Sequence, residues 1–106
     1  MVLYLQNGKW NGEQILAEDW VANSVKPAMK SSPIQYGYQW WLNTANDKGI
    51  RKYPSLPDDM YYADGYESQF VFVIPSKDLV IVRLGLTQGD YFNEEKFVAA
   101  IINAIK

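Results

Sequence analysis

The stretch Met60–Leu84, with the sequence MYYADGYESQFVFVIPSKDLVIVRL, decides the fold of this chain. It predicts a short aromatic strand, a tight turn and two apolar strands, Gln69–Ile74 and Leu79–Leu84, joined through Pro75–Asp78. An antiparallel strand with one solvated face alternates apolar and polar residues, whereas these two strands are apolar almost throughout. We therefore expect a central antiparallel sheet whose two faces are both covered.

The rest of the chain predicts the elements around this sheet. Glu94–Lys106 is predicted to be a helix, because Asn93 can cap it and its apolar residues form one stripe. Upstream, the sequence predicts a short apolar start ended by Asn7-Gly8, a turn at Asn11-Gly12, a helix Ala17–Val25, a polar loop Lys30–Pro33, a strand Gln35–Leu42 and a long loop Asn43–Pro57. This order predicts an α+β fold, in which an aromatic strand and a three-strand meander form an antiparallel sheet flanked by helices. The last helix can cover one face of the sheet, and the other face lacks an obvious partner.

Length and composition limit the classes of protein to which the chain can belong. Its 106 residues, 48% of them hydrophobic, suffice for a single globular domain over residues 1–106. The formal net charge is −2 and no Lys/Arg cluster occurs, so nucleic acid is not an expected partner. No apolar run is long enough for a membrane span, and no segment resembles a signal peptide. The absence of cysteine is compatible with either the cytoplasm or the periplasm.

The absence of histidine excludes most of the common catalytic sites. A Ser-His-Asp triad, a Cys-His pair and an imidazole metal site all require a residue that this sequence lacks. Catalysis would have to use Ser, Lys, Tyr, Asp, Glu or backbone amides. Serine hydrolases whose base is a Lys or a Tyr are the leading class of enzymes with these groups.

Several motifs resemble one such class. They are LYLQNGKWNGEQIL (3–16), EDW (18–20), YGYQWWL (36–42) and ADGYESQFVFVIPSKDLVIVRLG (63–85). Together they resemble the C-terminal part of the serine β-lactamase-related hydrolases, which include class C β-lactamases, DD-peptidases, β-lactamase-like carboxylesterases and 6-aminohexanoate-dimer hydrolases. The resemblance implies an intact protein that hydrolyses an amide, ester or β-lactam through an acyl-enzyme, without a metal or organic cofactor.

The resemblance also implies where one wall of an active site would lie. The third motif of the family, Lys-Thr-Gly or His-x-Gly, falls on Ala63-Asp64-Gly65. Gly65 matches, whereas Ala63 brings no cationic group, so anchoring of a substrate carboxylate is not implied. The backbone N–H of Tyr66 would form half of the oxyanion hole. Tyr62 and Trp41 would lie nearby.

The sequence departs from the family at the nucleophile. A Ser-x-x-Lys motif is absent, because the residues three positions after its serines are Pro27, Ile34, Gln35, Asp58, Val71 and Leu79. Tyr91-Phe92-Asn93 has the spacing of the second motif but follows the Gly65 strand instead of preceding it, so Asn93 is better explained as a helix cap. Ser68 stands in a turn where relatives usually have Gly, and it would be strained if φ is positive there. We therefore expect the chain alone to be inactive.

Two other interpretations remain open. The chain could be a small non-catalytic binding domain, in which the aromatic strand with Tyr36, Tyr38, Trp40 and Trp41 forms the binding surface. Alternating aromatic residues in a strand are more often packed in a core or interface. The acidic residues Asp58, Asp59, Asp64 and Glu67 could bind a hard cation, but they lack the spacing of a Ca²⁺ loop and are better explained as a solvated loop.

The resemblance finally predicts an unpaired strand. In the resembled fold the strand Leu79–Leu84 pairs on its far side with an N-terminal strand that this chain lacks. Its edge, flanked by Val80, Ile81 and Val82, would recruit a partner. We expect either a homo-oligomer or association with the missing N-terminal part. A third interpretation of the chain, a purely structural remnant that pairs with another chain, also predicts association through this edge.

Overall fold

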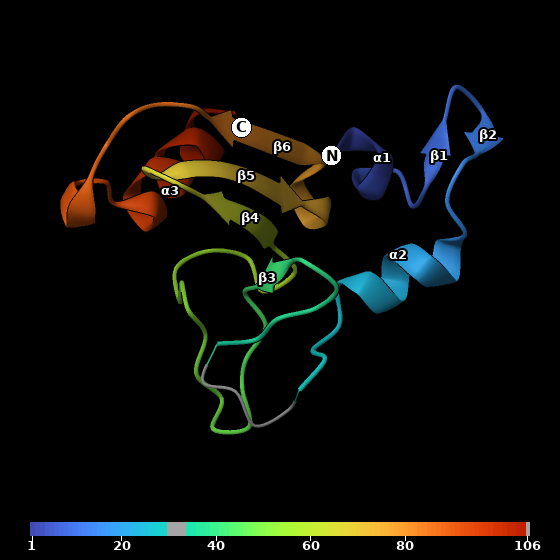
Figure 1. Ribbon diagram of the computed structural model, residues 1–106, viewed down its shortest axis with the longest axis horizontal. Coiled ribbons are helices and arrows are strands. Elements are labelled where there is room, and N and C mark those ends of the chain that lie inside the picture. The colour runs from blue at the N-terminus through green and yellow to red at the C-terminus, as the bar shows by residue number, and fades with distance from the viewer. Residues whose placement is uncertain (30–33, 106) are drawn as a thin grey trace.

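The computed structural model describes residues 1–29 and 34–105 (Figure 1). The predicted loop Lys30–Pro33 and the last residue of the predicted helix, Lys106, lie outside the described residues. A helix that is long and apolar enough to cross a membrane does not occur in the described part of the chain.

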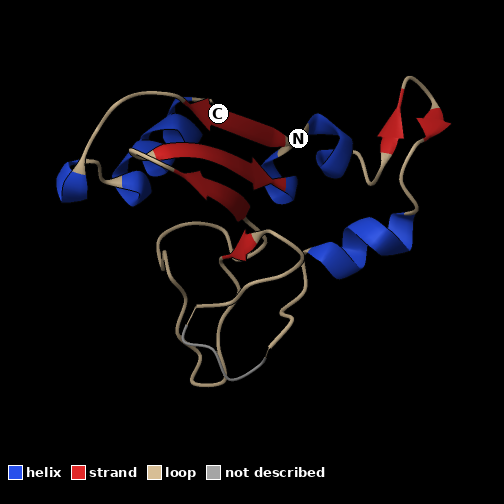
Figure 2. Ribbon diagram, viewed as in Figure 1, coloured by secondary structure: helices blue, strands red, loops and turns tan. Residues whose placement is uncertain are grey.

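An antiparallel four-stranded sheet lies at the centre of the molecule (Figure 2). Its strands, in spatial order, are β3 (Trp41–Leu42), β4 (Tyr61–Gly65), β5 (Gln69–Ile74) and β6 (Leu79–Arg83). A tight turn joins β4 to β5, and the 3₁₀ turn η1 (Pro75–Lys77) joins β5 to β6. The predicted meander and the predicted α+β fold are confirmed.

The other elements are helices and a small hairpin, and the hairpin lies to one side of the sheet (Figure 1). They are α1 (Val2–Leu5), β1 (Lys9–Trp10), β2 (Glu13–Gln14), α2 (Glu18–Ser24), the 3₁₀ turn η2 (Gly89–Tyr91) and α3 (Glu94–Ala104). Both predicted long helices are present, and Asn93 caps α3 as expected, since its Oδ1 accepts a hydrogen bond of 2.9 Å from the Lys96 N–H. The β1–β2 pair was not expected; the predicted Asn11-Gly12 turn connects its two strands.

The start of the chain ends its first helix with a Schellman motif. The N–H of Asn7 donates to Tyr4 O at 3.1 Å, and the N–H of Gly8 donates to Leu3 O at 2.8 Å. The left-handed position belongs to Asn7, with φ 55°, so the turn signal was right although Asn, not Gly, takes that position.

One face of the sheet packs against α3. Tyr62, Phe70, Phe72, Ile74 and Ile81 point to this side and form a core with Val98 of α3; Phe72, Ile74 and Val98 are fully buried. Amphipathic burial of this kind supplies most of the stability of a short helix.

The opposite face is covered over only part of its area. Tyr61 and Val73 pack there against Trp40 and Leu42, with Tyr4 and Leu5 of α1 beside them. Further along the same face, Ala63 and Val71 are half-buried and Val82 is 56% exposed. The expectation of two covered faces therefore holds for the α3 side and for one half of the other side.

The predicted strand Gln35–Leu42 is wrong for most of its length. Only Trp41–Leu42 is a strand, and the preceding residues fold back on it through a bridge between Tyr36 and Trp41. Gln39 is left-handed, with φ 66°, and the Gly37 N–H donates to Trp40 O at 2.8 Å. A tight turn therefore interrupts the aromatic run.

Gly37 allows this turn to lie against the end of α2. A Cβ atom at Gly37 would overlap the carbonyl oxygen of Ser24, and the same oxygen accepts a hydrogen bond of 2.9 Å from the Tyr38 N–H. Close backbone approach thus overrides the strand propensity of the Tyr and Trp residues.

Candidate functional site

The predicted site residues gather at one edge of the sheet. β3 pairs with β4 only at Tyr61 and Tyr62. Beyond that point the segment Ala63–Gly65 has β5 on one side and, among the described residues, no strand on the other. Ala63 is half-buried, whereas Asp64 and Gly65 are exposed. This unpaired part of β4 offers backbone N–H and C=O groups to a ligand or to another segment of protein.

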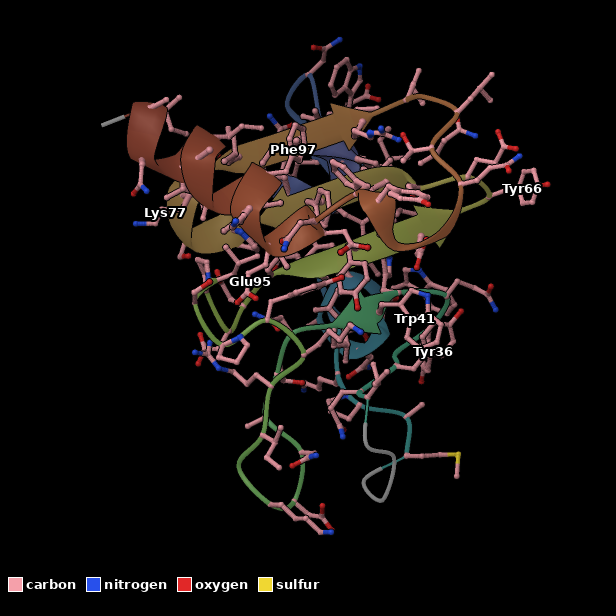
Figure 3. The ribbon with its side chains drawn as sticks, turned by 90° about the vertical axis from the view of Figure 1, so that its left-hand side faces the viewer. Tyr36, Trp41, Tyr66, Lys77, Glu95 and Phe97 are labelled. Carbon is pink, nitrogen blue, oxygen red and sulfur yellow. The ribbon has the colours of Figure 1, made fainter. Side chains whose placement is uncertain are left out.

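Tyr62 and Trp41 lie next to each other at the paired end of this edge. They are register partners across β3 and β4, on the face that packs against α3. The Tyr62 side chain is 3% exposed, and its ring centroid is 5.5 Å from that of Tyr53. Trp41 is half-buried, and its ring lies 4.5 Å from that of Tyr36 (Figure 3). Trp41 can therefore contact a ligand at the edge, whereas Tyr62 supports the edge from the core.

Tyr66 follows β4 at the tip of the β4–β5 hairpin. Its side chain is 81% exposed and points away from the rest of the molecule (Figure 3). The next two residues, Glu67 and Ser68, both have positive φ, at 59° and 63°. Because Gly65 pairs with Gln69, the loop of this hairpin has three residues, Tyr66, Glu67 and Ser68, and positive φ disfavours residues that carry a Cβ atom. Ser68 is therefore strained, as the comparison with Gly at this position predicted.

Arg83 holds this turn from the side of β6. Its Nη1 donates to Ser68 O at 2.7 Å and its Nη2 donates to Thr87 Oγ1 at 2.6 Å. The guanidinium also lies 4.3 Å from the centroid of the Phe92 ring. The Thr87 N–H in turn donates to Glu67 O at 3.1 Å. Arg83 of β6 and Thr87 thus both bond to the turn that begins at Tyr66, and Phe92 contacts the Arg83 guanidinium.

A small group of charged and phenolic side chains surrounds Asp64. Partial burial and the carboxylate of Glu94 raise the pKa of Asp64, and the Lys52 ammonium acts in the opposite direction. Burial also raises the pKa of Tyr62 to about 12, and the interaction with the Tyr53 hydroxyl lowers it in part. Because burial raises the pKa of both Tyr53 and Tyr62, neither phenol is an anion at neutral pH. Neither of them is therefore a tyrosinate that could act as a general base.

Three serine hydroxyls of the described region, those of Ser24, Ser55 and Ser76, form structural hydrogen bonds. Ser24 Oγ donates to Trp20 O at 2.6 Å, Ser55 Oγ to Glu95 Oε1 at 2.6 Å, and Ser76 Oγ to Asp59 Oδ1 at 2.8 Å. A hydroxyl fixed to a carbonyl or to an exposed carboxylate in this way is a cap or a turn contact.

Known proteins resemble this chain at the level of structure. A search of family models and a search of curated proteins both found no match. Among solved structures, a candidate 6-aminohexanoate-dimer hydrolase from Bacillus anthracis matches 97% of this chain with a TM-score of 0.61 and 22% sequence identity. The chain has the fold of part of that hydrolase. It spans about a quarter of the length of that protein, since the match covers 25% of its chain.

The hydrolase-like fold also contains site residues that the sequence analysis did not identify. Arg83 is the single charged residue after Leu79 in the predicted strand Leu79–Leu84, and it fixes the turn after Tyr66. Lys52 and Glu94 approach Asp64 from a loop and from α3, far away in sequence. A single Arg inside an apolar strand was the one signal available, because an interior charge requires partners. For Lys52 and Glu94, no local pattern in the sequence indicated a contact with Asp64.

Proposed function

We propose that this chain is the C-terminal portion of a β-lactamase-related serine hydrolase and supplies one wall of its active site. The nucleophilic Ser and the Lys and Tyr that activate it belong to another segment. In this proposal the intact protein transfers the acyl group of an amide, ester or β-lactam to the serine and then to water. The Tyr66 N–H donates to the oxyanion, Trp41, Ala63, Asp64 and Gly65 line the wall, and the buried Tyr62, which the sequence had placed in the wall itself, supports it from the core.

One observation carries the proposal. Among the described residues, no strand pairs with Ala63–Gly65 on the side opposite β5, and the solved chain with this fold is about four times longer than this one. An edge of this kind needs a covering segment, and a hydrolase active site between two parts of a protein needs a wall of backbone donors. The turn held by Arg83 supports the proposal, because an oxyanion donor must be fixed before the reaction starts.

The first test is made on the chain alone and then on the chain with a complement. The purified chain should hydrolyse neither a chromogenic β-lactam nor a p-nitrophenyl ester, and a fluorophosphonate probe should label none of its serines. Co-expression with the polypeptide encoded directly upstream of Met1 should give an active complex. The probe should then label a serine of a Ser-x-x-Lys motif in that polypeptide. Labelling of a serine in this chain would contradict the proposal.

The second test addresses the oxyanion donor in the active complex. Gly65→Val should lower kcat by roughly 100-fold, because a donor is displaced. A Cβ atom added at Gly65 would lie only 3.3 Å from Gln69 O, so a valine side chain must shift the turn. Tyr66→Phe leaves the amide in place and should stay within about tenfold of the parent. Small and equal effects of both changes would place the oxyanion hole elsewhere.

The second candidate function is a non-catalytic binding domain. Within the predicted aromatic surface, Trp40 is only 5% exposed and the rings of Tyr36 and Trp41 contact each other, so these three rings offer little area to a ligand. The exposed rings of the region are those of Trp20 and Tyr38. Ligand binding through these rings, without hydrolysis by any complex of the chain, would favour this function.

A further inference from the structure

An aromatic groove lies beside β4 on the sheet face opposite α3. Its volume is about 600 Å³, and its walls include Tyr4 of α1, Trp20 of α2, Tyr38 and Trp40 of the turn before β3, and Ala63 of β4. Four of the eight described residues that line it are aromatic, and they come from segments far apart in the sequence. Grooves lined by aromatic side chains from several elements are typical of small-molecule sites.

The rings of this groove form a fixed floor with two accessible sides. Trp40 is 5% exposed and its ring lies edge-to-face with that of Tyr4, with centroids 5.2 Å apart. Trp20 and Tyr38 are 50% and 48% exposed, and their centroids are 5.5 Å apart. The Trp20 indole N–H donates to the Tyr4 hydroxyl at 3.3 Å. The exposed rings are therefore held in place by their neighbours, which lowers the entropy lost when a ligand binds.

The groove contains no side chain that would recognise a charged ligand. None of the described residues that line it is Asp, Glu, Lys or Arg, and Gln39 adds an uncharged amide. A substrate carboxylate would lose its hydration there without gaining an ion pair to any of these side chains. An uncharged group with a ring can instead stack on the rings of Trp20 and Tyr38.

Ala63 connects the groove with the proposed active-site wall. It lines the groove, and it is also the first residue of the unpaired segment of β4. A substrate whose reactive carbonyl lies along this edge can therefore place a substituent in the groove. We infer that the aromatic groove binds an uncharged, ring-bearing substituent of an amide or ester substrate. This inference rests on the proposed hydrolase function for the identity of the substrate and on the groove itself for the binding.

The test measures binding to the chain by itself and needs no catalysis. N-benzylacetamide is titrated into the ¹⁵N-labelled chain, and its analogue 4-(acetamidomethyl)benzoate, which adds a carboxylate to the same skeleton, is titrated in parallel. The α-amino group of Met1 is acetylated in all samples, because Met1 lies at the groove. We expect N-benzylacetamide to shift the Trp20 indole signal and the Ala63 amide signal, and to bind more tightly than the carboxylate.

Variants then locate the binding. Trp20→Ala and Tyr38→Ala should each raise the Kd for N-benzylacetamide about threefold to tenfold, and Trp20→Phe should raise it less. Trp10→Ala is the matched control, since Trp10 is 51% exposed but lies on the β1–β2 hairpin, and it should leave the Kd unchanged. Ala63→Lys should reverse the preference in favour of the carboxylate. All of the aromatic variants change half-exposed side chains, and their ¹⁵N spectra show directly whether they are folded.

Three results would overturn the inference. They are the absence of shifts at Trp20 and Ala63, tighter binding of the carboxylate to the parent chain, and an equal loss of affinity in Trp10→Ala. Each leaves the hydrolase proposal standing, because that proposal depends on the fluorophosphonate-labelled complex. If N-benzylacetamide binds with the expected pattern but no complex of the chain shows hydrolysis, the groove is a binding site and the hydrolase proposal is wrong.

Discussion

The side chain of Asn43 forms two hydrogen bonds with the backbone of Tyr53. Its Oδ1 accepts from the Tyr53 N–H at 2.8 Å, and its Nδ2 donates to Tyr53 O at 3.0 Å. The same Nδ2 lies 2.9 Å from Pro57 O, and the Asn43 N–H donates to Met60 O at 2.9 Å. Asn43 is fully buried, so this one residue joins Tyr53, Pro57 and Met60 of the segment between β3 and β4.

Asn43→Ala should lower the free energy of unfolding by about 3–5 kcal/mol. The substitution leaves the Tyr53 N–H and several carbonyl groups buried without partners, each at a cost of about 1–3 kcal/mol. Urea denaturation followed by tryptophan fluorescence measures the change. Asn46→Ala is the control: the Asn46 Oδ1 also accepts from the backbone, at Lys48 and Ile50, but these bonds are exposed, and the loss should stay below about 1.5 kcal/mol. Equal losses would show that Asn43 has no special role.

Ser68→Gly should stabilise the chain by about 1 kcal/mol. Ser68 has φ 63°, and a residue with a Cβ atom is less stable in this conformation by about 1–2 kcal/mol than glycine. Ser68→Ala keeps the strain and should be close to neutral. Thermal and urea unfolding of the two variants give the comparison, and a destabilised glycine variant would contradict the assigned turn.

Arg83→Met should loosen the turn after Tyr66 more than it destabilises the fold. The variant removes hydrogen bonds to Ser68 and Thr87 from a half-buried guanidinium. Amide hydrogen exchange at Thr87, whose N–H is bonded to Glu67 O, should become at least tenfold faster. Arg51→Met, which removes bonds to Leu56 and Pro54 instead, should leave this exchange rate unchanged.

Stability should fall steeply as the pH rises above about 10. Burial raises the pKa of Tyr61 and of Tyr62 to about 12, and it raises that of Tyr53 still further, above the ordinary value of 10. The folded chain therefore keeps these protons while the unfolded chain loses them, so stability is complete below pH 10 and is lost as the pH rises toward 12. Each tyrosine contributes at most about 1.4 kcal/mol per pH unit.

Urea denaturation at pH 8, 10 and 11 measures this slope. Tyr62→Phe should reduce the slope of stability against pH by about the contribution of one buried tyrosine. Tyr91→Phe changes a side chain that is 92% exposed and should leave the slope unchanged. A slope that is the same in Tyr62→Phe and in the parent would mean that burial of Tyr62 does not govern the alkaline transition.

The edge of β6 should support self-association. β6 is the last strand of the sheet, α1 approaches it, and Val82 on it is 56% exposed. Unpaired apolar edges recruit other strands. Size-exclusion chromatography with light scattering should show a dimer or larger species, and Val82→Lys should shift it toward the monomer. Ile15→Lys is the control, because Ile15 is about as exposed as Val82 but lies outside the sheet, and it should leave the association unchanged. A parent chain that stays monomeric at high micromolar concentration would contradict the prediction.

The sequence predicted the parts of the fold that depend on local patterns. Two apolar runs with a Pro-containing turn gave β5 and β6, and a cap followed by an apolar stripe gave α3. The failure at Gln35–Leu42 has a tertiary cause, because the contact of Gly37 with Ser24 bends an aromatic run that by composition favours a strand.

The candidate site was predictable to a similar extent. The position of the β4 edge follows from the resemblance and from the strand pattern. The partners of Asp64 and of the turn after Tyr66 come from α3, from β6 and from the segment between β3 and β4. Contacts between distant segments leave no periodic signal in the sequence.

The arrangement of the meander has a consequence for how the chain folds. Its strand pairs are at most 13 residues apart in the sequence, so the β4–β5–β6 unit has low contact order and can form early. The hydrogen bond between Ser55 and Glu95 closes a separation of 40 residues and must wait for both the loop and α3. We therefore expect the hairpins to form before the link between Ser55 and Glu95, and we expect this exposed link to open early in unfolding.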